Sequence, residues 1–264
     1  MELQQSLVDL ERAGVAVFAI SYDPVEVLSA FAEKRSITFP MLSDQGSAVI
    51  RQLGLLNEHI DQQHAYFGVE TQQRHRGIPY PGALVLDEDG LVADKVFEQQ
   101  HRTRPSAAAL VEAVLHGAST RPSASAAAEG AGIRVTVSLG QDCYRPYQKL
   151  LLHLRLKIPA GAHVYADPAP EGQTGLTGAL ETIDGLEAAA LELPPPSTIT
   201  SFGEQFQGYE NDVTGTLWFA INKFHGDVSL QAMVRYQACT DVLCYPPAEL
   251  RIPLVLRGVD LIQD

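Results

Sequence analysis

Residues 228–247 read VSLQAMVRYQACTDVLCYPP. Apolar residues occupy every second position from Val228 to Tyr236, the period of a strand with one buried face. Four residues separate Cys239 from Cys244, and a hairpin closing over them would set the two thiols roughly opposite each other. Directly opposed Cβ atoms lie about 4.5–5.5 Å apart and a disulfide needs about 3.5–4.5 Å, so a small adjustment makes or breaks the bond.

The short spacing of the two cysteines bears on whether a disulfide between them would be structural or exchangeable. Closing a loop of about six residues contributes only ~2 kcal/mol in the chain-entropy model, which suits an exchangeable bond better than a structural one. A permanent hairpin disulfide and two reduced core cysteines remain the alternatives. If the alternation continues, Cys239 falls on the polar face of its strand, and its thiol is accessible unless a loop covers it.

Length and charge narrow the class of protein. The 264 residues suffice for one large or two ordinary domains. A formal net charge of -13 argues against nucleic-acid binding, because phosphate recognition needs a basic patch. No apolar run approaches the ~20 residues of a membrane span. The opening residues 1–5, MELQQ, predict no signal peptide in this chain.

Cysteine and histidine spacing predicts neither a metal site nor a cofactor. With three cysteines in the chain, Cys143 is expected to be a small, partly buried residue, and a resolving role for it is the alternative. A zinc site at the close pair would need two more ligands, and no second cysteine pair or close histidine pair supplies them. His59 and His64 lie in a polar stretch that is better explained as solvated.

Residues 1–116 alternate helix and strand signals and predict an α/β layered domain. Expected helices cover 2–13, the segment after Asp23-Pro24, 48–53 and 105–116. Expected strands are 15–20, buried on both faces, and 38–42, with a hairpin over 83–97 and a patternless insertion at 57–76.

Residues 117–132 are rich in Ala, Ser, Gly and Pro and predict a flexible linker. From residue 133 the hydrophobic period becomes two. Half-buried antiparallel strands separated by Pro/Gly loops predict a β-sandwich over 133–264.

The second domain resembles the N-terminal periplasmic domain of the thiol:disulfide interchange protein DsbD, an immunoglobulin-like sandwich. The resemblance rests on the Tyr-Gln-x-Cys and Cys-Tyr-Pro-Pro segments and spans about 133–257. It implies that Cys239 and Cys244 pass electrons between a membrane partner and periplasmic redox proteins. It also implies that Phe206 shields the pair as part of a cap loop, and that the side chains lining the site include Tyr165 and Tyr245.

The first domain resembles the AhpC/TSA-type, thioredoxin-like redoxins. The matching segments are 17–23, 31–34, 37–44 and 77–87. Pro81 stands where such folds often place a cis-proline facing the redox centre, with an ordinary loop proline as the alternative. Residues 1–142 contain no cysteine, so this domain is expected to be inactive as given. Either it is a binding module that has lost its redox centre, or its coding sequence extends upstream of Met1; the second is favoured.

These patterns predict a thiol:disulfide oxidoreductase of the periplasm or another exported location. Its partner would be a thioredoxin-like or membrane redox protein, held by a transient mixed disulfide. Two alternatives stay open: a non-catalytic protein that docks a redox partner and carries a structural disulfide, and a peroxiredoxin-like antioxidant whose active site lies upstream.

Overall fold

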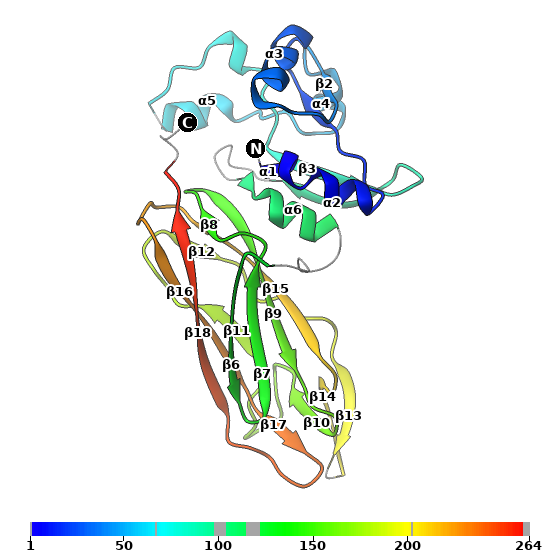
Figure 1. Ribbon diagram of the computed structural model, residues 1–264, viewed down its shortest axis with the longest axis vertical. Helices are drawn as coiled ribbons and strands as arrows, with labels where there is room; N and C mark the ends of the chain where they lie inside the picture. Colours follow the sequence, from blue (N-terminus) through cyan, green and yellow to red (C-terminus); the bar gives the residue numbers. More distant parts are fainter. Residues whose placement is uncertain (1, 67, 98–103, 115–121, 202, 261–264) are drawn as a thin grey trace. The chain divides into compact units, whose positions relative to one another are not determined.

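The computed structural model describes residues 2–66, 68–97, 104–114, 122–201 and 203–260. The chain divides into two compact units, Met1–Leu115 and His116–Asp264. Helices and short strands alternate in the described part of the first unit, and long strands dominate the second (Figure 1). An α/β region followed by a β-sandwich confirms the predicted fold class.

The first unit contains six α-helices, one 3₁₀-helix and five short strands in its described residues. In chain order they are α1 (Glu2–Gln5), α2 (Leu7–Arg12), β1 (Ala19–Ser21), α3 (Val25–Arg35), β2 (Met41–Ser43), α4 (Ala48–Gln52), α5 (Ile60–Tyr66), η1 (Gln73–His75), β3 (Gly82–Leu86), β4 (Val92–Phe97), β5 (Arg104–Pro105) and α6 (Ala107–Val114).

Helix α3 connects the parallel strands β1 and β2, as a parallel pair requires a crossover. It begins directly after Pro24 and ends at Ser36, which takes the left-handed conformation with φ 52°. Lys34 and Arg35 lie in its last turn, where positive charge complements the helix dipole. A small core lies beside this crossover, made of Leu7, Ile37 and Phe39.

Three expectations for this unit are wrong in detail. The predicted helix 2–13 is split into α1 and α2, with a break at Ser6. The expected strand 15–20 is confined to β1, and Ile20 is 40% exposed. Phe18 is 61% exposed as well, so this segment is not buried on both faces. The insertion 57–76, expected to lack pattern, contains α5 and η1.

The predicted hairpin over 83–97 is confirmed as β3 and β4, which pair antiparallel. Its turn is stabilised by Asp87, whose carboxylate accepts hydrogen bonds from the backbone N–H groups of Asp89 and Leu91. Gly90 supplies the positive φ of 79° that the turn needs. Turn chemistry therefore accounts for the acidic residues in this segment.

The described part of the second unit is built from thirteen strands. They are β6 (Ala124–Gly130), β7 (Ile133–Leu139), β8 (Cys143–Tyr144), β9 (Gln148–Lys157), β10 (Ala162–Tyr165), β11 (Thr177–Leu180), β12 (Leu186–Ala188), β13 (Ser197–Ser201), β14 (Glu204–Tyr209), β15 (Val213–Ile221), β16 (Val228–Tyr236), β17 (Ala238–Thr240) and β18 (Ala248–Gly258).

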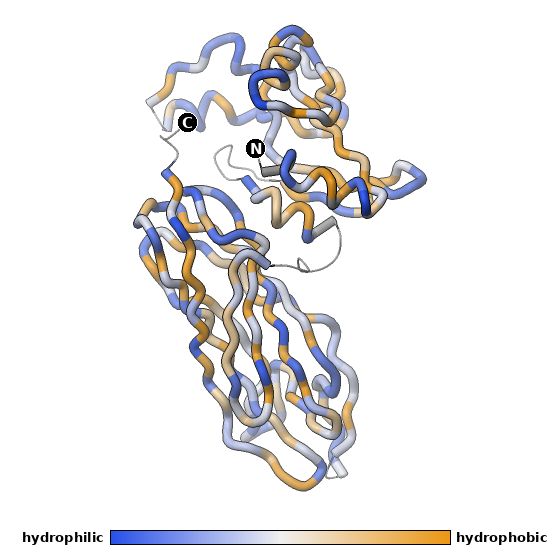
Figure 2. The backbone as a smooth tube through the Cα atoms, viewed as in Figure 1, coloured by the Kyte–Doolittle hydropathy of each residue, from blue (hydrophilic) through white to orange (hydrophobic). Residues whose placement is uncertain are grey.

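Two sheets of this unit form the sandwich, in the orders β12-β15-β9-β7-β6 and β11-β16-β18-β8. The third sheet, β13-β14-β10-β17, lies at one end of the unit (Figure 1). Hydrophobic and hydrophilic residues alternate along these strands (Figure 2), and the buried apolar residues form one core. In β16 this core face carries Leu230, Ala232, Val234 and Tyr236, as the period of two predicts.

The prediction of a flexible linker is wrong for residues 124–130, which form β6. This strand pairs with β7 along its whole length. The short side chains of Ala124, Ala126 and Ala128 pack against the sandwich core, so the backbone ladder and close packing outweigh a composition poor in β-formers. Residues 117–121 of the predicted linker lie outside the described residues.

Tyr236 connects β16 to the end of β6. Its side chain is fully buried, and its hydroxyl donates a hydrogen bond of 2.6 Å to the carbonyl of Gly130. Burial, helped by Glu129, raises the pKa of Tyr236 to about 12. The folded state therefore favours the neutral phenol.

We predict that Tyr236→Phe lowers the free energy of unfolding at neutral pH by about 1 kcal/mol, because a buried carbonyl loses its donor. The unfolded phenol ionises near pH 10 and the folded one only near pH 12, so the native chain also loses stability as pH rises through this window. Tyr236→Phe should lose less stability over the same window. Urea unfolding at pH 8 and pH 11 measures both effects.

Tyr245→Phe is the matched control, because the Tyr245 side chain is exposed. It should unfold as the native chain does at both pH values. Equal unfolding of Tyr236→Phe and the native chain at pH 8 would contradict a stabilising role for the Tyr236–Gly130 hydrogen bond.

Candidate functional site

Cys239 and Cys244 are joined in a disulfide across a tight hairpin, with an S–S distance of 2.07 Å and a Cα–Cα distance of 4.0 Å. They form an antiparallel bridge, and hydrogen bonds flank it: Thr240 N–H to Leu243 O and Tyr245 N–H to Ala238 O. The Thr240 hydroxyl accepts the Leu243 N–H and tightens the turn. This arrangement confirms that the two sulfurs lie opposite each other.

The sheet β13-β14-β10-β17 builds one face around this disulfide. In its register His163 lies opposite Cys239 and Tyr165 lies opposite Gly208. Because side chains alternate between the faces of a strand, His163 and Tyr165 share the face of Cys239. The intervening Val164 and the neighbouring Ala238 point to the other face and join the sandwich core.

Cys239 therefore lies on the side of β17 away from the core, as the sequence predicts. The sequence predicts an accessible thiol here unless a loop covers it, and Cys239 is 0% exposed, so the covered alternative applies. The rings of His163, Tyr165 and Phe206 pack against one another on this face. Cys244 is partly exposed, so the two sulfurs differ in their access to solvent.

Tyr165 contacts both sulfurs. Its hydroxyl lies 3.5 Å from Cys239 Sγ and 3.9 Å from Cys244 Sγ. A disulfide sulfur carries no proton, so the phenol is the donor in either contact. Burial raises the pKa of Tyr165, and the carboxylate of Glu204 raises it further. The phenol therefore keeps its proton and can stabilise negative charge on a sulfur.

Phe206 on β14 packs against the other two rings of the site. Its ring centroid lies 4.7 Å from that of Tyr165 and 5.0 Å from that of His163. Gly208 allows β14 to approach β10 this closely, because a Cβ there would lie 2.6 Å from the carbonyl oxygen of Val164. Phe206 lies in a strand and not in a loop, and it contacts the ring of Tyr165, whose hydroxyl contacts both sulfurs. Its shielding role stays a prediction.

His163 is the residue that sequence reasoning missed. Its side chain is 3% exposed, and its Nε2 atom has no hydrogen-bond partner. Burial lowers its pKa, against the opposing carboxylates of Glu210 and Asp241. The period of two relates His163 to Tyr165, so once Tyr165 was placed beside the cysteines, the same alternation could have indicated His163.

The remaining predicted site residues are Tyr245 and Pro81. Tyr245 follows Cys244 and its side chain is 38% exposed at the edge of the hairpin. Pro81 is buried just before β3 in the first unit. The cis alternative for Pro81 is wrong: in the described residues the cis peptide bond is Asp167–Pro168, and Pro81 keeps the trans form that most X-Pro bonds adopt.

The solvated interpretation holds for His59, which is exposed, but it is wrong for His64, which is buried in α5. The Nδ1 atom of His64 lies 3.1 Å from the Thr71 hydroxyl, and its ring packs edge-on against His75 at 4.9 Å. Within the described ranges, no group of three or more His, Cys, Asp or Glu side chains is arranged to hold a metal ion.

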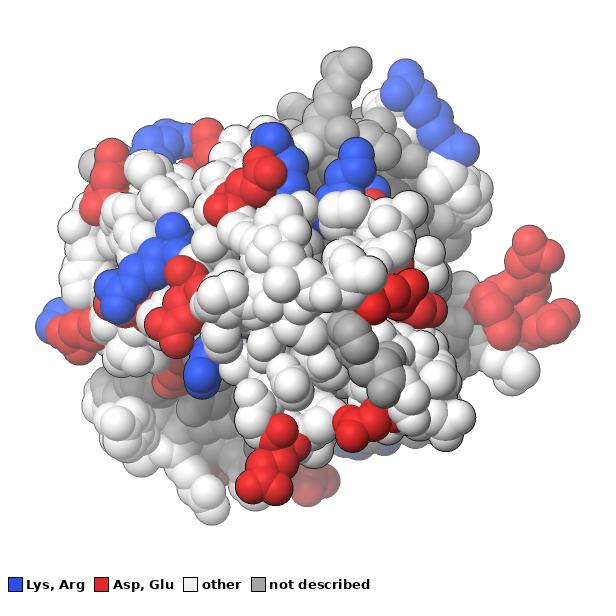
Figure 3. Space-filling model, turned by 90° about the horizontal axis from the view of Figure 1, so that it is seen from below, with Lys and Arg blue, Asp and Glu red and all other residues white. Residues whose placement is uncertain are grey.

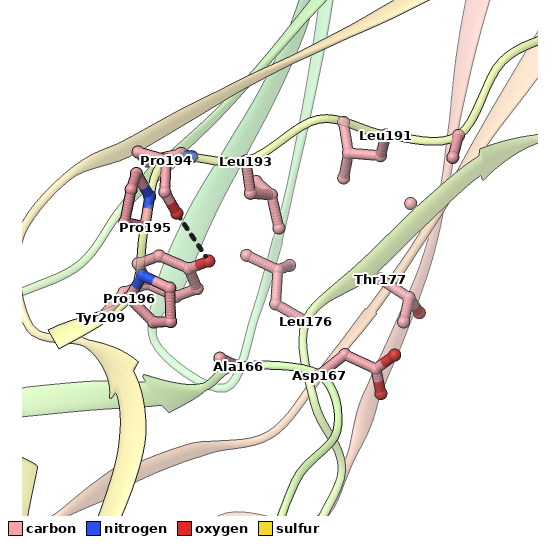
Figure 4. A pocket seen from close by; sticks show the side chains of 12 residues that line it. Ala166, Asp167, Leu176, Thr177, Leu191, Leu193, Pro194, Pro195, Pro196 and Tyr209 are labelled. Atoms are coloured by element: carbon pink, nitrogen blue, oxygen red, sulfur yellow. Dashed lines mark hydrogen bonds between the residues drawn. The ribbon is translucent and has the colours of Figure 1, made fainter. Parts of the chain in front are cut away.

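A groove of about 510 Å³ opens elsewhere in the second unit (Figure 4). Leu176, Leu191 and Leu193 line it, with a wall of three prolines at 194–196. The Tyr209 hydroxyl donates to the carbonyl of Pro194 at 3.1 Å. Neither Cys239 nor Cys244 lines this groove.

Comparison with known proteins finds a matching family model for each region. Residues 1–95 match the AhpC/TSA family, and residues 126–256 match the N-terminal region of the thiol:disulfide interchange protein DsbD. Peroxiredoxin Bcp of Escherichia coli (strain K12) is 39% identical over 96 residues, which are 36% of this chain and 54% of that protein. The chain thus spans about half the length of the curated relatives it matches.

Two solved structures give weaker matches. The N-terminal periplasmic domain of ScsB from Proteus mirabilis aligns with a TM-score of 0.38 and 13% identity, covering 51% of each chain. The complex between the DsbD N-terminal and PilB N-terminal domains from Neisseria meningitidis aligns with a TM-score of 0.29 and 17% identity, over 39% of this chain and 73% of that one.

Both matched families are families of thiol redox proteins. The chain joins an AhpC/TSA-type, thioredoxin-like region to a domain of the DsbD N-terminal type. The predicted resemblances are confirmed for both regions.

We predict that Phe206→Ala speeds reduction of the disulfide by dithiothreitol about tenfold, because access to the sulfurs limits thiol–disulfide exchange. Alkylation of the released thiols followed by mass spectrometry measures the rate. Phe224→Ala is the matched control, since Phe224 is already 44% exposed and lies outside the sheet of the disulfide. An unchanged rate for Phe206→Ala would show that its ring does not shield the bond.

Proposed function

We propose that this protein exchanges electrons with a partner dithiol through the Cys239–Cys244 disulfide, and that the partner thiolate attacks Cys244. The observation that carries the proposal is the asymmetry of the pair. Cys244 is partly exposed, and Cys239 is buried beside the Tyr165 hydroxyl. Exchange requires access to the attacked sulfur and stabilisation of the sulfur that leaves.

The exchange proceeds in two displacements. A partner thiolate bonds to Cys244 Sγ, the Cys239–Cys244 bond breaks, and its electron pair stays on Cys239 as a thiolate, which takes up a proton. The second partner thiolate then attacks the mixed disulfide and releases Cys244. The partner ends as a disulfide, and Cys239 and Cys244 end as thiols, so two electrons have passed to this protein.

The surface around Cys244 suits a protein partner. Val242 is 87% exposed and Leu243 is 51% exposed at the tip of the hairpin, next to Tyr245 and the exposed prolines Pro246 and Pro247. Exposed apolar side chains gathered in one place favour a docking surface. We therefore propose a thioredoxin-like or membrane redox protein as the partner.

Charge on this end of the second unit favours a basic surface on that partner. Glu204, Glu210 and Asp241 are exposed, and their carboxylates act on Tyr165 or His163. Figure 3 shows the end that carries the hairpin, where Asp and Glu side chains, interspersed with Lys and Arg, surround a largely uncharged area. Complementary charge speeds the encounter of two proteins more than it tightens their complex.

The redoxin-like region adds no thiol of its own in this chain, because residues 1–142 contain no cysteine. Its proposed role is to supply or accept electrons for the disulfide through a redox centre outside these residues. Peroxide reduction, the activity that the name of the relative suggests, would need that centre too.

The match to DsbD N-terminal domains supports a periplasmic or otherwise exported location, where conditions allow a disulfide to form and exchange. No helix in the described ranges is long and apolar enough to cross a membrane.

We predict that Cys239→Ser and Cys244→Ser differ in trapping a partner. The probe is a thioredoxin-fold protein with a single active-site cysteine, activated as its mixed disulfide with thionitrobenzoate. Cys239→Ser leaves Cys244 free and should release thionitrobenzoate at least about tenfold faster than Cys244→Ser, because the remaining thiol of the latter is buried. Absorbance measures the release, and the oxidised native chain is the control.

The proposal would be contradicted if the Cys239–Cys244 disulfide proved to be purely structural. A reduction potential below about −300 mV for the Cys239–Cys244 pair would mark it as structural. Failure of both single-cysteine variants to capture the probe would point to the same conclusion.

A further inference from the structure

His163 carries a buried polar atom that the oxidised protein does not use. The side chain is 97% buried, from its exposure of 3%, and Nε2 has no hydrogen-bond partner. Leaving such a group unsatisfied destabilises a fold, so most buried polar atoms are paired. In the oxidised state, this imidazole nitrogen therefore remains available to form a hydrogen bond.

The register sets this imidazole next to the sulfur that would leave. His163 and Cys239 are directly opposed on the antiparallel strands β10 and β17, and such pairs have Cβ atoms about 4.5–5.5 Å apart. The rings of Tyr165 and Phe206 lie against His163 at 5.5 Å and 5.0 Å. Water thus has little access to the space that His163 and Cys239 share.

We propose that His163 accepts a hydrogen bond from the thiol of Cys239 once the disulfide is reduced. This inference rests on the proposed function, in which Cys239 is the buried sulfur that leaves. When the S–S bond breaks, Cys239 keeps the electron pair and takes up one proton. The S–H group then donates to Nε2, which gains the partner that it lacks in the oxidised state.

The groups around His163 are consistent with this role. Burial lowers the pKa of His163, although Glu210 and Asp241 oppose the shift, so the neutral ring with a free lone pair prevails at neutral pH. On its own strand Tyr165 keeps its phenolic proton and serves as a donor to sulfur. Glu204 on β14 acts on Tyr165 and is exposed. Tyr165 would stabilise the leaving thiolate, and His163 the protonated thiol.

The test compares His163→Phe and His163→Gln with the native full chain in equilibrium with reduced and oxidised glutathione. His163→Phe removes the acceptor from the reduced state, so the equilibrium constant for reduction should fall about fivefold, the factor expected for one net hydrogen bond. His163→Gln offers a carboxamide oxygen at similar reach and should restore part of the loss. Quantifying the alkylated thiols gives the constants.

A second measurement needs no variant and no protein partner. In the native chain, labelled with ¹⁵N at histidine, the Nε2 chemical shift of His163 should change when dithiothreitol reduces the disulfide, toward that of a hydrogen-bonded acceptor. An unchanged shift, or a His163→Phe constant equal to that of the native chain, would overturn the role of His163. If His163→Phe fails to fold, the Nε2 chemical shift of the native chain and the glutathione equilibrium of His163→Gln still test the proposed hydrogen bond. Failed trapping at Cys244, by contrast, would overturn the proposed function and leave the His163–Cys239 hydrogen bond standing.

Discussion

The redox site depends on one structural constraint, the register of the short strand β10 against its two neighbours. Pairing with β17 sets His163 opposite Cys239, and pairing with β14 sets Tyr165 opposite Gly208. Because a strand alternates its faces, the same register sends Val164 and Ala238 into the sandwich core. A slip of one residue would bury the wrong set of side chains, so the packed core fixes the geometry of the disulfide face.

This arrangement makes the two sulfurs chemically unequal. Cys239 is fully buried, with the Tyr165 hydroxyl 3.5 Å from its sulfur, and Cys244 is partly exposed in the hairpin. A short hairpin disulfide restrains little of the unfolded chain, so its chemistry is governed mainly by its surroundings. Gly208 lets β14 approach β10 closely, and this brings the Phe206 ring against Tyr165 and His163.

The first unit differs from the second in how much it buries. Strands β1 and β2 form a parallel pair, and large apolar side chains such as Phe18, Ile20 and Leu42 are exposed there. The second unit carries a continuous core of alternating residues from two sheets. The first unit matches the AhpC/TSA family, yet the cysteines that the chain contains all lie beyond residue 142. The proposed exchange chemistry therefore rests on the sandwich.

Local patterns in the sequence determined the class of both regions, the turn at Asp87–Gly90 and the opposition of Cys239 to Cys244, because each depends on neighbours within a few residues. Alternation also placed Cys239 on the face away from the core. Only the tertiary structure decided that this face is covered and that β6 is a strand, since both follow from pairing with distant segments. His163 went unnoticed for the same reason: its significance comes from a residue 76 positions away, brought opposite it by the sheet.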